Sequence, residues 1–185
     1  MRMDVNAIEV LSEDHSALQA LFGRVSQPDE NRPAVLDQLL KSLTAHVATE
    51  KQLIVPILTG HSHEGEALAQ QLGDDHDAIE KLVILVERRK VNSPDVPDLV
   101  NKLLEITQRH TRQADECLLP FLRDQLSEAD LADLGAAMRS DERQLTSHPH
   151  PHLPDTGPLA KITRKAAALI DRGRDSTTDL QRPGP

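Results

Sequence analysis

An apolar repeat at steps of three and four residues runs through most of the chain and restricts its fold more than any other feature. The repeat falls into four long segments, expected as helices over about residues 6–25, 33–58, 64–90 and 96–126. This spacing aligns side chains on one face of an α-helix, and short connections make consecutive helices antiparallel. We therefore predict an all-α fold, an antiparallel up-down four-helix bundle within residues 1–126.

Composition favours helices over strands. The chain of 185 residues is 38% apolar, yet its aromatic side chains are limited to Phe22 and Phe121, so the core must be largely aliphatic. Ser127 and Asp130 form a capping-box pattern, which predicts a short fifth helix within residues 127–145. Beyond it we expect a histidine- and proline-rich linker and then a basic amphipathic C-terminal tail, partly disordered, over residues 146–158 and 159–185.

Each of the four segments carries one histidine within its apolar stripe: His15, His46, His76 and His110. Measured from the connecting loops at about 1.5 Å per residue, the four histidines lie within roughly one helical turn, or about 5 Å, of the same level. Glu50 lies one turn beyond His46 on the same face. The four histidines and this glutamate are therefore expected to meet inside the bundle.

Such a buried polar cluster needs a bonding partner. Burying an imidazole or a carboxylate group is unfavourable unless its polar atoms have hydrogen-bond partners or bind a metal. Metal binding would satisfy all of these groups. Facing helices of bundles hold iron or manganese through nitrogen and carboxylate ligands. Zinc usually takes four ligands, so the larger number of candidates favours two ions. The alternative for any single histidine is an ordinary core residue with a hydrogen-bond partner.

The polar positions belong to an internal repeat. The sequence HVATEKQLIVPIL begins at His46 and HTRQADECLLPFL begins at His110, and each has proline ten positions after its histidine (56 minus 46, and 120 minus 110). Upstream of these, EDHSALQAL with His15 is matched by DDHDAIEKL with His76. The simplest interpretation is two divergent copies of one helical hairpin.

Together these motifs resemble the hemerythrin-like HHE cation-binding family over the four predicted helices. The resemblance rests on His15 in LSEDH, the H-x-x-x-E of His46 and Glu50, His76 in DDH, and His110 followed by an acid and LLP. A tail with HPHPHLP is also similar to those of actinobacterial members. The resemblance implies a four-helix bundle with a non-haem, carboxylate- and oxo-bridged centre of two iron ions.

Two positions depart from the oxygen-carrying members of that family. Where they have H-x-x-x-H on the third helix, this chain has Glu80, which resembles the carboxylate of many bacterial relatives; the alternative is a surface carboxylate paired with a lysine or arginine. On the fourth helix Ala114 stands where an acid would complete H-x-x-x-E. Asp115 matches an H-x-x-x-x-D spacing but lies about 140° from His110 in an ideal helix. It needs a π-like bulge to face inward, and Glu116 is the alternative.

The expected metal ligands are His15, His46, Glu50, His76, Glu80, His110 and Asp115, and no catalytic side chain is assigned. Because Glu80 exchanges a neutral imidazole for an anion, it favours the ferric state over reversible dioxygen carriage. We therefore expect a protective, catalase- or peroxidase-like reaction with peroxide or oxygen. The alternatives are a non-catalytic module that binds or senses oxygen, nitric oxide or iron, and a helical adaptor with a vestigial polar core.

Charge and composition also bear on partners and location. The net charge of −9 repels phosphate backbones and argues against nucleic acid, and no run approaches the roughly 18 apolar residues of a membrane span. The start MRMDVNAIEV lacks an apolar signal region. Cys117 is the single cysteine, which fits a reducing compartment, and we expect it to be buried. We expect a cytoplasmic monomer or weak dimer. Its remaining histidines are expected in solvated turns and in the linker: His61, His63, His148, His150 and His152.

Overall fold

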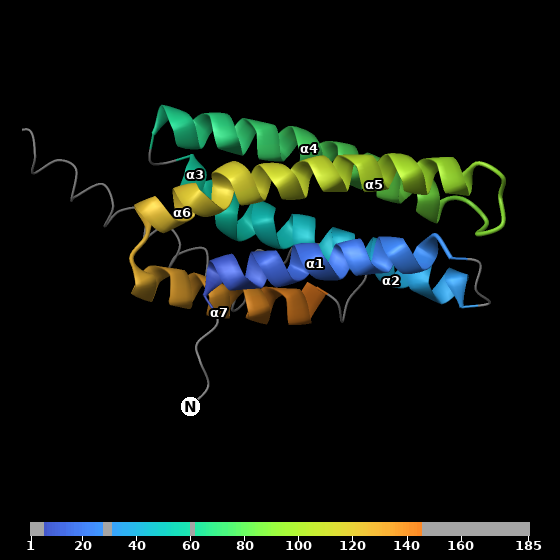
Figure 1. Ribbon diagram of the computed structural model, residues 1–185, viewed down its shortest axis with the longest axis horizontal. Coiled ribbons are helices and arrows are strands. Elements are labelled where there is room, and N and C mark those ends of the chain that lie inside the picture. The colour runs from blue at the N-terminus through green and yellow to red at the C-terminus, as the bar shows by residue number, and fades with distance from the viewer. Residues whose placement is uncertain (1–5, 28–30, 60–61, 146–185) are drawn as a thin grey trace, which may run out of the picture.

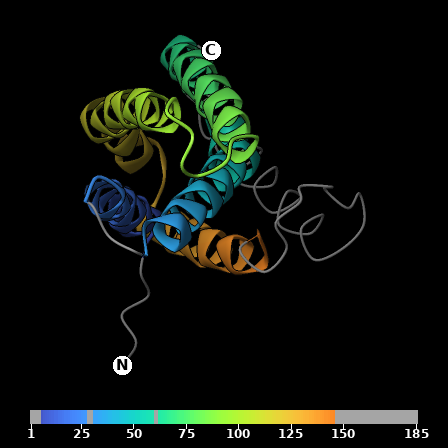
Figure 2. The same ribbon diagram turned by 90° about the vertical axis from the view of Figure 1, so that its right-hand side faces the viewer.

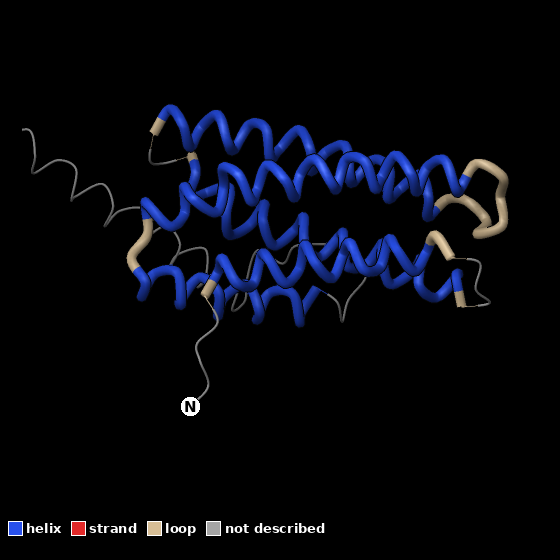
Figure 3. Tube along the Cα trace, viewed as in Figure 1, coloured by secondary structure: helices blue, strands red, loops and turns tan. Residues whose placement is uncertain are grey.

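The computed structural model describes residues 6–27, 31–59 and 62–145, with side chains up to residue 140. Within these ranges all regular secondary structure is helical (Figure 3). The elements are α1 (Ala7–Val25), α2 (Arg32–Thr49), η1 (Glu50–Ile54), α3 (Val55–Leu58), α4 (His63–Glu87), α5 (Val96–Gln113), η2 (Ala114–Leu118), α6 (Leu119–Gln125) and α7 (Glu128–Leu145), where η marks a π-helix. The linker and tail expected over residues 146–185 lie outside the described residues.

The helices form four antiparallel rods with a fifth beside them (Figure 1). The π-helices continue the rods in which they lie, so α2, η1 and α3 make one rod and α5, η2 and α6 make another. The most extensive contacts pair α1 with α2 and α4 with α5, α2 also packs on α4, and α1 meets α5 over a much smaller area. Viewed from the end, α7 lies outside the bundle against α1 and α2 (Figure 2). The predicted four-helix bundle with a short fifth helix is confirmed.

Local signals begin the helices where the sequence places them. Asn6 and Glu9 form a reciprocal capping box at the start of α1, and the Ser62 side chain accepts a hydrogen bond from Gly65 N at the start of α4. Ser127 accepts the Asp130 N–H in the same way at α7. These caps satisfy backbone donors that have no partner in the first turn of a helix.

Gly65 permits a close crossing where α4 folds back on α3. A Cβ added at this position would run into the backbone oxygen of Leu58. A side chain is therefore excluded here, and only glycine allows α4 to start this close to the end of the second rod. The close approach holds the two antiparallel rods together at this end of the bundle.

The apolar core is divided into two clusters by a polar layer. One cluster includes Leu11, Leu53, Leu72 and Leu122, and the other includes Leu18, Leu43, Ile79 and Leu103. On each rod the sequence position between the two clusters is taken by a buried histidine. The apolar clusters therefore enclose the histidine layer along the bundle axis and exclude water from it at both ends.

No helix among the described residues is both long and apolar enough to cross a membrane. Of the two histidines expected in the turn before α4, His63 is the first residue of that helix and its side chain is exposed. His61 lies outside the described residues.

Candidate metal centre

The five residues expected to meet inside the bundle lie together in the polar layer. His15, His46, His76 and His110 come from α1, α2, α4 and α5, and Glu50 is the first residue of η1. All five are at most 4% exposed. Helix geometry alone therefore brings four imidazoles and one carboxylate from four rods into one layer.

Their ligand atoms converge on Glu50. Its Oε2 lies 2.7 Å from His76 Nε2 and 3.4 Å from His110 Nε2, and its Oε1 lies 3.6 Å from His46 Nε2 and 4.0 Å from His15 Nε2. The Nε2 atoms of His46 and His110 are 3.1 Å apart. One ligand atom from each of four residues lies within 4.8 Å of the others: His15, His46, Glu50 and His110. This is a complete donor set for a four-coordinate ion.

The cluster leaves buried polar atoms without hydrogen bonds inside the protein. Both ring nitrogens of His15 and the Oε1 atom of Glu50 have no hydrogen-bond partner. An unpartnered buried polar atom is unfavourable by roughly 1–3 kcal/mol. Imidazole nitrogens and carboxylate oxygens are the ligands that iron, manganese and zinc accept. The residues present therefore fit a metal ion.

The environment of the layer favours the neutral imidazole, the form whose ring nitrogen can bind a metal ion. Burial lowers the pKa of His46 to about 3 and also lowers the pKa of His15 and of His110. Burial alone would raise the pKa of Glu50, but the surrounding His46 and His110 and the hydrogen bond from His76 lower it below its usual range. Near neutral pH His15, His46 and His110 are therefore neutral rings beside an ionised Glu50, and these are the protonation states that metal ligands require.

Two π-turns occur at matching points of the two hairpins. Val55 N bonds to Glu50 O, and Leu119 N bonds to Ala114 O, so each turn spans five residues rather than four. A proline, Pro56 or Pro120, follows directly in the next turn. Proline has no N–H and its ring clashes with the carbonyl four residues earlier, and the wider turn relieves both problems. The π-turn of η1 was not predicted, and the proline repeated ten positions after each histidine was the available signal for it.

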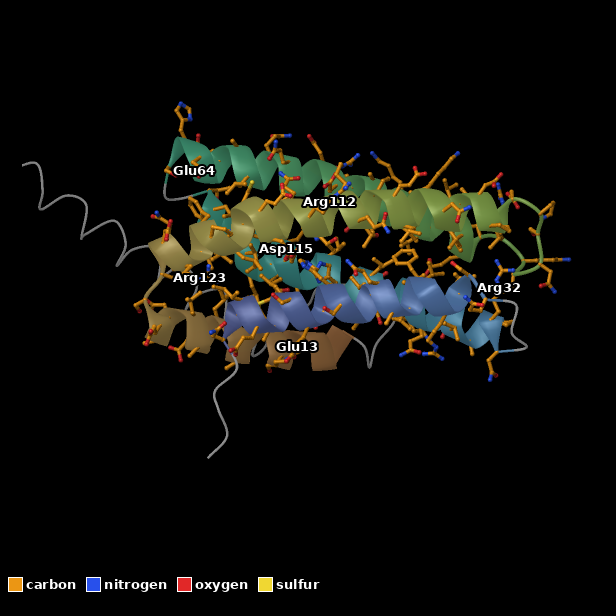
Figure 4. All side chains as sticks on the ribbon, in the orientation of Figure 1. Glu13, Arg32, Glu64, Arg112, Asp115 and Arg123 are labelled. Atoms are coloured by element: carbon orange, nitrogen blue, oxygen red, sulfur yellow. The ribbon has the colours of Figure 1, made fainter. Side chains whose placement is uncertain are left out.

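The π-turn that Asp115 needs is therefore present, but its side chain lies outside the four-donor group. Asp115, which is labelled in Figure 4, is exposed on η2, as is Glu116, and the buried position is held by Ala114, which is 2% exposed. Asp115 is close enough to His15 to favour the protonated form of that ring. Asp115 thus lies near His15 but outside the four-donor group, and its role as a ligand stays a prediction.

Glu80 also lies at the edge of the layer. Its side chain is 45% exposed, and its Oε2 accepts a hydrogen bond of 2.8 Å from Lys51 Nζ. Lys51 also contacts Asp77 at 3.2 Å. Burial lowers the pKa of Lys51, but these two bonds outweigh burial and leave the pKa above its usual value. The surface ion pair weighed as an alternative for Glu80 is therefore formed, and ligation by Glu80 stays a prediction.

The expected burial of Cys117 is wrong. The thiol is exposed, because η2 contains an extra residue per turn. After Ala114 the next inward position is therefore Leu118, and Cys117 turns towards solvent.

Two ion pairs next to the histidine layer were not predicted from the sequence. Asp75 is 4% exposed and accepts from Arg109 Nε at 3.1 Å, linking α4 to α5. Asp14 accepts from Arg139 Nη1 at 3.1 Å, linking α1 to α7. Each aspartate directly precedes a histidine of the layer in the repeated DH pair. That repeat was the available signal, and the pairs hold the helices that carry His15 and His76.

Comparisons with known proteins agree with this arrangement. The family model of the hemerythrin HHE cation-binding domain matches residues 6–122. An uncharacterized hemerythrin-like protein of Schizosaccharomyces pombe is 22% identical over 170 residues, which cover 90% of this chain and 84% of that protein. A DNA nickase of Nostoc is 27% identical over 128 residues, covering 68% of this chain and 36% of the nickase.

The fold is also that of a solved relative. The crystal structure of a hemerythrin HHE cation-binding domain-containing protein from Mycobacterium kansasii, a homologue of Rv2633c, matches with a TM-score of 0.68 and 24% identity. The match covers 91% of this chain and 99% of the other. A family match over more than half of the chain, the shared bundle and the buried histidine–glutamate layer lead to one conclusion: this chain belongs to the hemerythrin HHE cation-binding family.

Proposed function

We propose that this protein binds two iron ions within its bundle and uses them to react with peroxide or oxygen in a protective, catalase- or peroxidase-like role. The observation that carries the proposal is the convergence of His15, His46, Glu50 and His110, with donor atoms within 4.8 Å and several of them unpartnered. These four would hold the first ion. His76 and the second oxygen of Glu50, with Glu80 and Asp115, would contribute to the second.

The chain's own groups suit redox chemistry in a protected site. Bound iron would supply redox chemistry, relaying two electrons from one peroxide molecule, which leaves as oxygen, to a second, which becomes two molecules of water. Glu50 contributes a negative charge at the middle of the layer, and Glu80 and Asp115 add two more at its edge. Anionic oxygen ligands stabilise the higher oxidation state of iron. The flanking apolar clusters keep bulk water from the donors.

A groove between α1 and α5 offers a small molecule an approach to the layer. It is lined on α1 by Gln19, Phe22 and Gly23 and on α5 by Gln108, Thr111 and Arg112, among others. Gln19 lies one turn from His15, and Thr111 directly follows His110. The groove therefore begins next to two of the proposed ligands, where the α1–α5 contact is sparse.

A non-catalytic module that binds oxygen, nitric oxide or iron is the second candidate. It is favoured by the deep burial of all five central residues, since Glu50 and His76 are fully buried and a buried site can hold a ligand without turnover. The DNA activity in the name of the Nostoc relative is not transferred to this chain, because a net charge of −9 opposes contact with phosphates.

Metal content and transient kinetics test the proposal. Protein produced in iron-replete cells should contain about two iron atoms per chain, and the near-ultraviolet bands of ferric iron should be easy to see because the chain has no Trp or Tyr. A colourless protein with only trace metal would contradict the metal centre. In stopped-flow mixing, the ferric protein should consume hydrogen peroxide. Peroxide left untouched, with oxygen bound and released intact by the ferrous protein, would establish the binding module instead.

A further inference from the structure

Lys51 places a cation of the chain itself at the edge of the metal centre. It directly follows Glu50 in η1 and reaches across to α4, where its ammonium group lies 2.8 Å from Glu80 and 3.2 Å from Asp77. The Lys51 side chain is 36% exposed, so the contact lies between the buried layer and solvent. The carboxylate expected to bind a second ion is therefore already occupied by a positive charge.

The donors left for a second ion on η1 and α4 are engaged with each other or with Lys51. Once the first ion has taken one atom each from His15, His46, Glu50 and His110, the remaining candidates on α4 are His76 and Glu80, one turn apart. His76 Nε2 is bonded to Glu50 Oε2 at 2.7 Å, and Glu80 is bonded to Lys51. A metal ion would bind His76 Nε2 and the Glu80 carboxylate at about 2.0–2.2 Å, in place of their present hydrogen-bond partners, so both contacts must open before a second ion can bind.

Charge adds to this competition. An ammonium group that remains near Glu80 repels an incoming divalent ion, because like charges a few ångströms apart interact strongly outside bulk water. The first position lacks this repulsion, because within the described residues its four donors contact each other and His76 but no lysine or arginine. Within the described residues, the second position therefore has a lysine beside its expected carboxylate ligand, whereas the first position does not.

From these contacts we infer that Lys51 makes the centre load in two unequal steps. The first ion binds tightly at the four converging donors, and the second binds only by displacing the Lys51 ammonium from Glu80. The inference rests on the proposed metal-binding function and concerns how the second position of that centre is filled. Lys51 is thus a positioning residue for metal loading, acting through Glu80. When no more than one metal ion is available per chain, the ions therefore occupy the first position.

Titration of the metal-free, full-length chain with Co²⁺ tests the inference, with calorimetry for affinities and visible absorption for coordination. The wild type should show a first ion and a second ion at least about tenfold weaker. In Lys51→Met the second affinity should rise by about tenfold, while the first stays within about threefold. Circular dichroism monitors folding, and Lys51→Gln replaces Lys51→Met if methionine disturbs the half-exposed position.

Three variants serve as controls. Lys51→Arg keeps a cation beside Glu80, so the second ion should remain weak. Lys41→Met removes a lysine from an exposed pair with Asp37, which has a similar length of 2.7 Å, and should change neither affinity. Lys51→Met combined with Glu80→Gln should abolish the gain, because the released carboxylate is no longer available.

The outcomes separate this inference from the proposed function. If Lys51→Met leaves the second affinity unchanged, or the wild type binds two ions equally tightly, Lys51 does not compete with metal, although the centre itself stands. If the wild type binds no Co²⁺, both the inference and the proposed metal centre are overturned.

Discussion

Glu50 is the residue through which the four histidines are connected. One of its oxygens lies near His76 and His110 and the other near His46 and His15, and its side chain is fully buried. Glu80 differs in both respects, because it is half exposed and its carboxylate faces Lys51. A carboxylate at the middle of a donor set affects every ligand position, whereas one at the edge affects a single position.

Glu50→Ala should therefore lose more metal than Glu80→Ala. We expect Glu50→Ala to weaken the first ion by more than about tenfold and to leave little iron after gel filtration, while Glu80→Ala retains the first ion. Iron and protein are quantified in parallel on both purified variants. Equal iron retention in the two would show that the ranking of these carboxylates is incorrect.

At the scale of elements, the helices are shaped by single residues at their ends and turns. Pro56 and Pro120 accompany the two π-turns, and these turns set which side chains face inward further along each rod. Gly65 sets how closely α4 approaches α3. Gly73 lies on the same helix, but a Cβ at that position would have nothing within 4 Å apart from the nearby backbone of its own helix. The two glycines of α4 thus form a matched pair, one tightly packed and one open.

Alanine at these two glycines should have opposite effects on stability. Gly65→Ala forces its Cβ against the Leu58 backbone and should destabilise the fold by about 1–3 kcal/mol. Gly73→Ala adds a good helix former in open space and should stabilise it by about 0.5–1 kcal/mol. Urea unfolding followed by circular dichroism measures both. A neutral Gly65→Ala would mean that α4 starts further from α3 than the structure shows.

At the scale of the whole molecule, a polar layer interrupts the hydrophobic core. The buried layer contains three imidazoles whose pKa values are held below the ordinary value of 6.5, with that of His46 at about 3. Neutral imidazoles surrounded by apolar clusters are compatible with a folded metal-free state. Protonation of the same rings is not, because the charged form would be buried.

The metal-free protein should therefore lose stability on acidification. Below pH 6.5 these histidines bind protons in the unfolded chain but remain neutral in the folded chain. The free energy of unfolding therefore falls as the pH drops from 6.5 towards about 3. Each such histidine contributes a slope of up to about 1.4 kcal/mol per pH unit. Urea unfolding of chelator-treated protein at pH 7, 6 and 5 measures the slope.

Two variants identify the source of this pH dependence. His46→Leu should reduce the slope, because it removes a ring whose pKa is lowered to about 3. His63→Gln changes an exposed histidine outside the layer, at the start of α4, and serves as the control. An unfolding midpoint that is constant from pH 7 to pH 5 would contradict the burial of neutral imidazoles.

The sequence alone was sufficient to predict the four rods, the fifth helix and the layer of His15, His46, His76 and His110. The reason is that apolar period and helical rise are local properties, so the face and height of a side chain follow from position along one helix. Glu50 was found in the same way, one turn after His46. The DH pairs and repeated prolines also carried information about the ion pairs and π-turns, although their meaning became evident only in three dimensions.

Tertiary structure decided which charged groups meet and which side chains leave the core. Glu80 is paired with Lys51 from another rod, and that contact depends on the relative rotation of two helices, which no periodicity within either helix specifies. Cys117 faces solvent because one extra residue in η2 rotates everything that follows it. Asp115, on the same turn, is exposed and lies outside the four-donor group. An apolar stripe determines where a helix is buried, but the contacts at its edges are determined by the helices beside it.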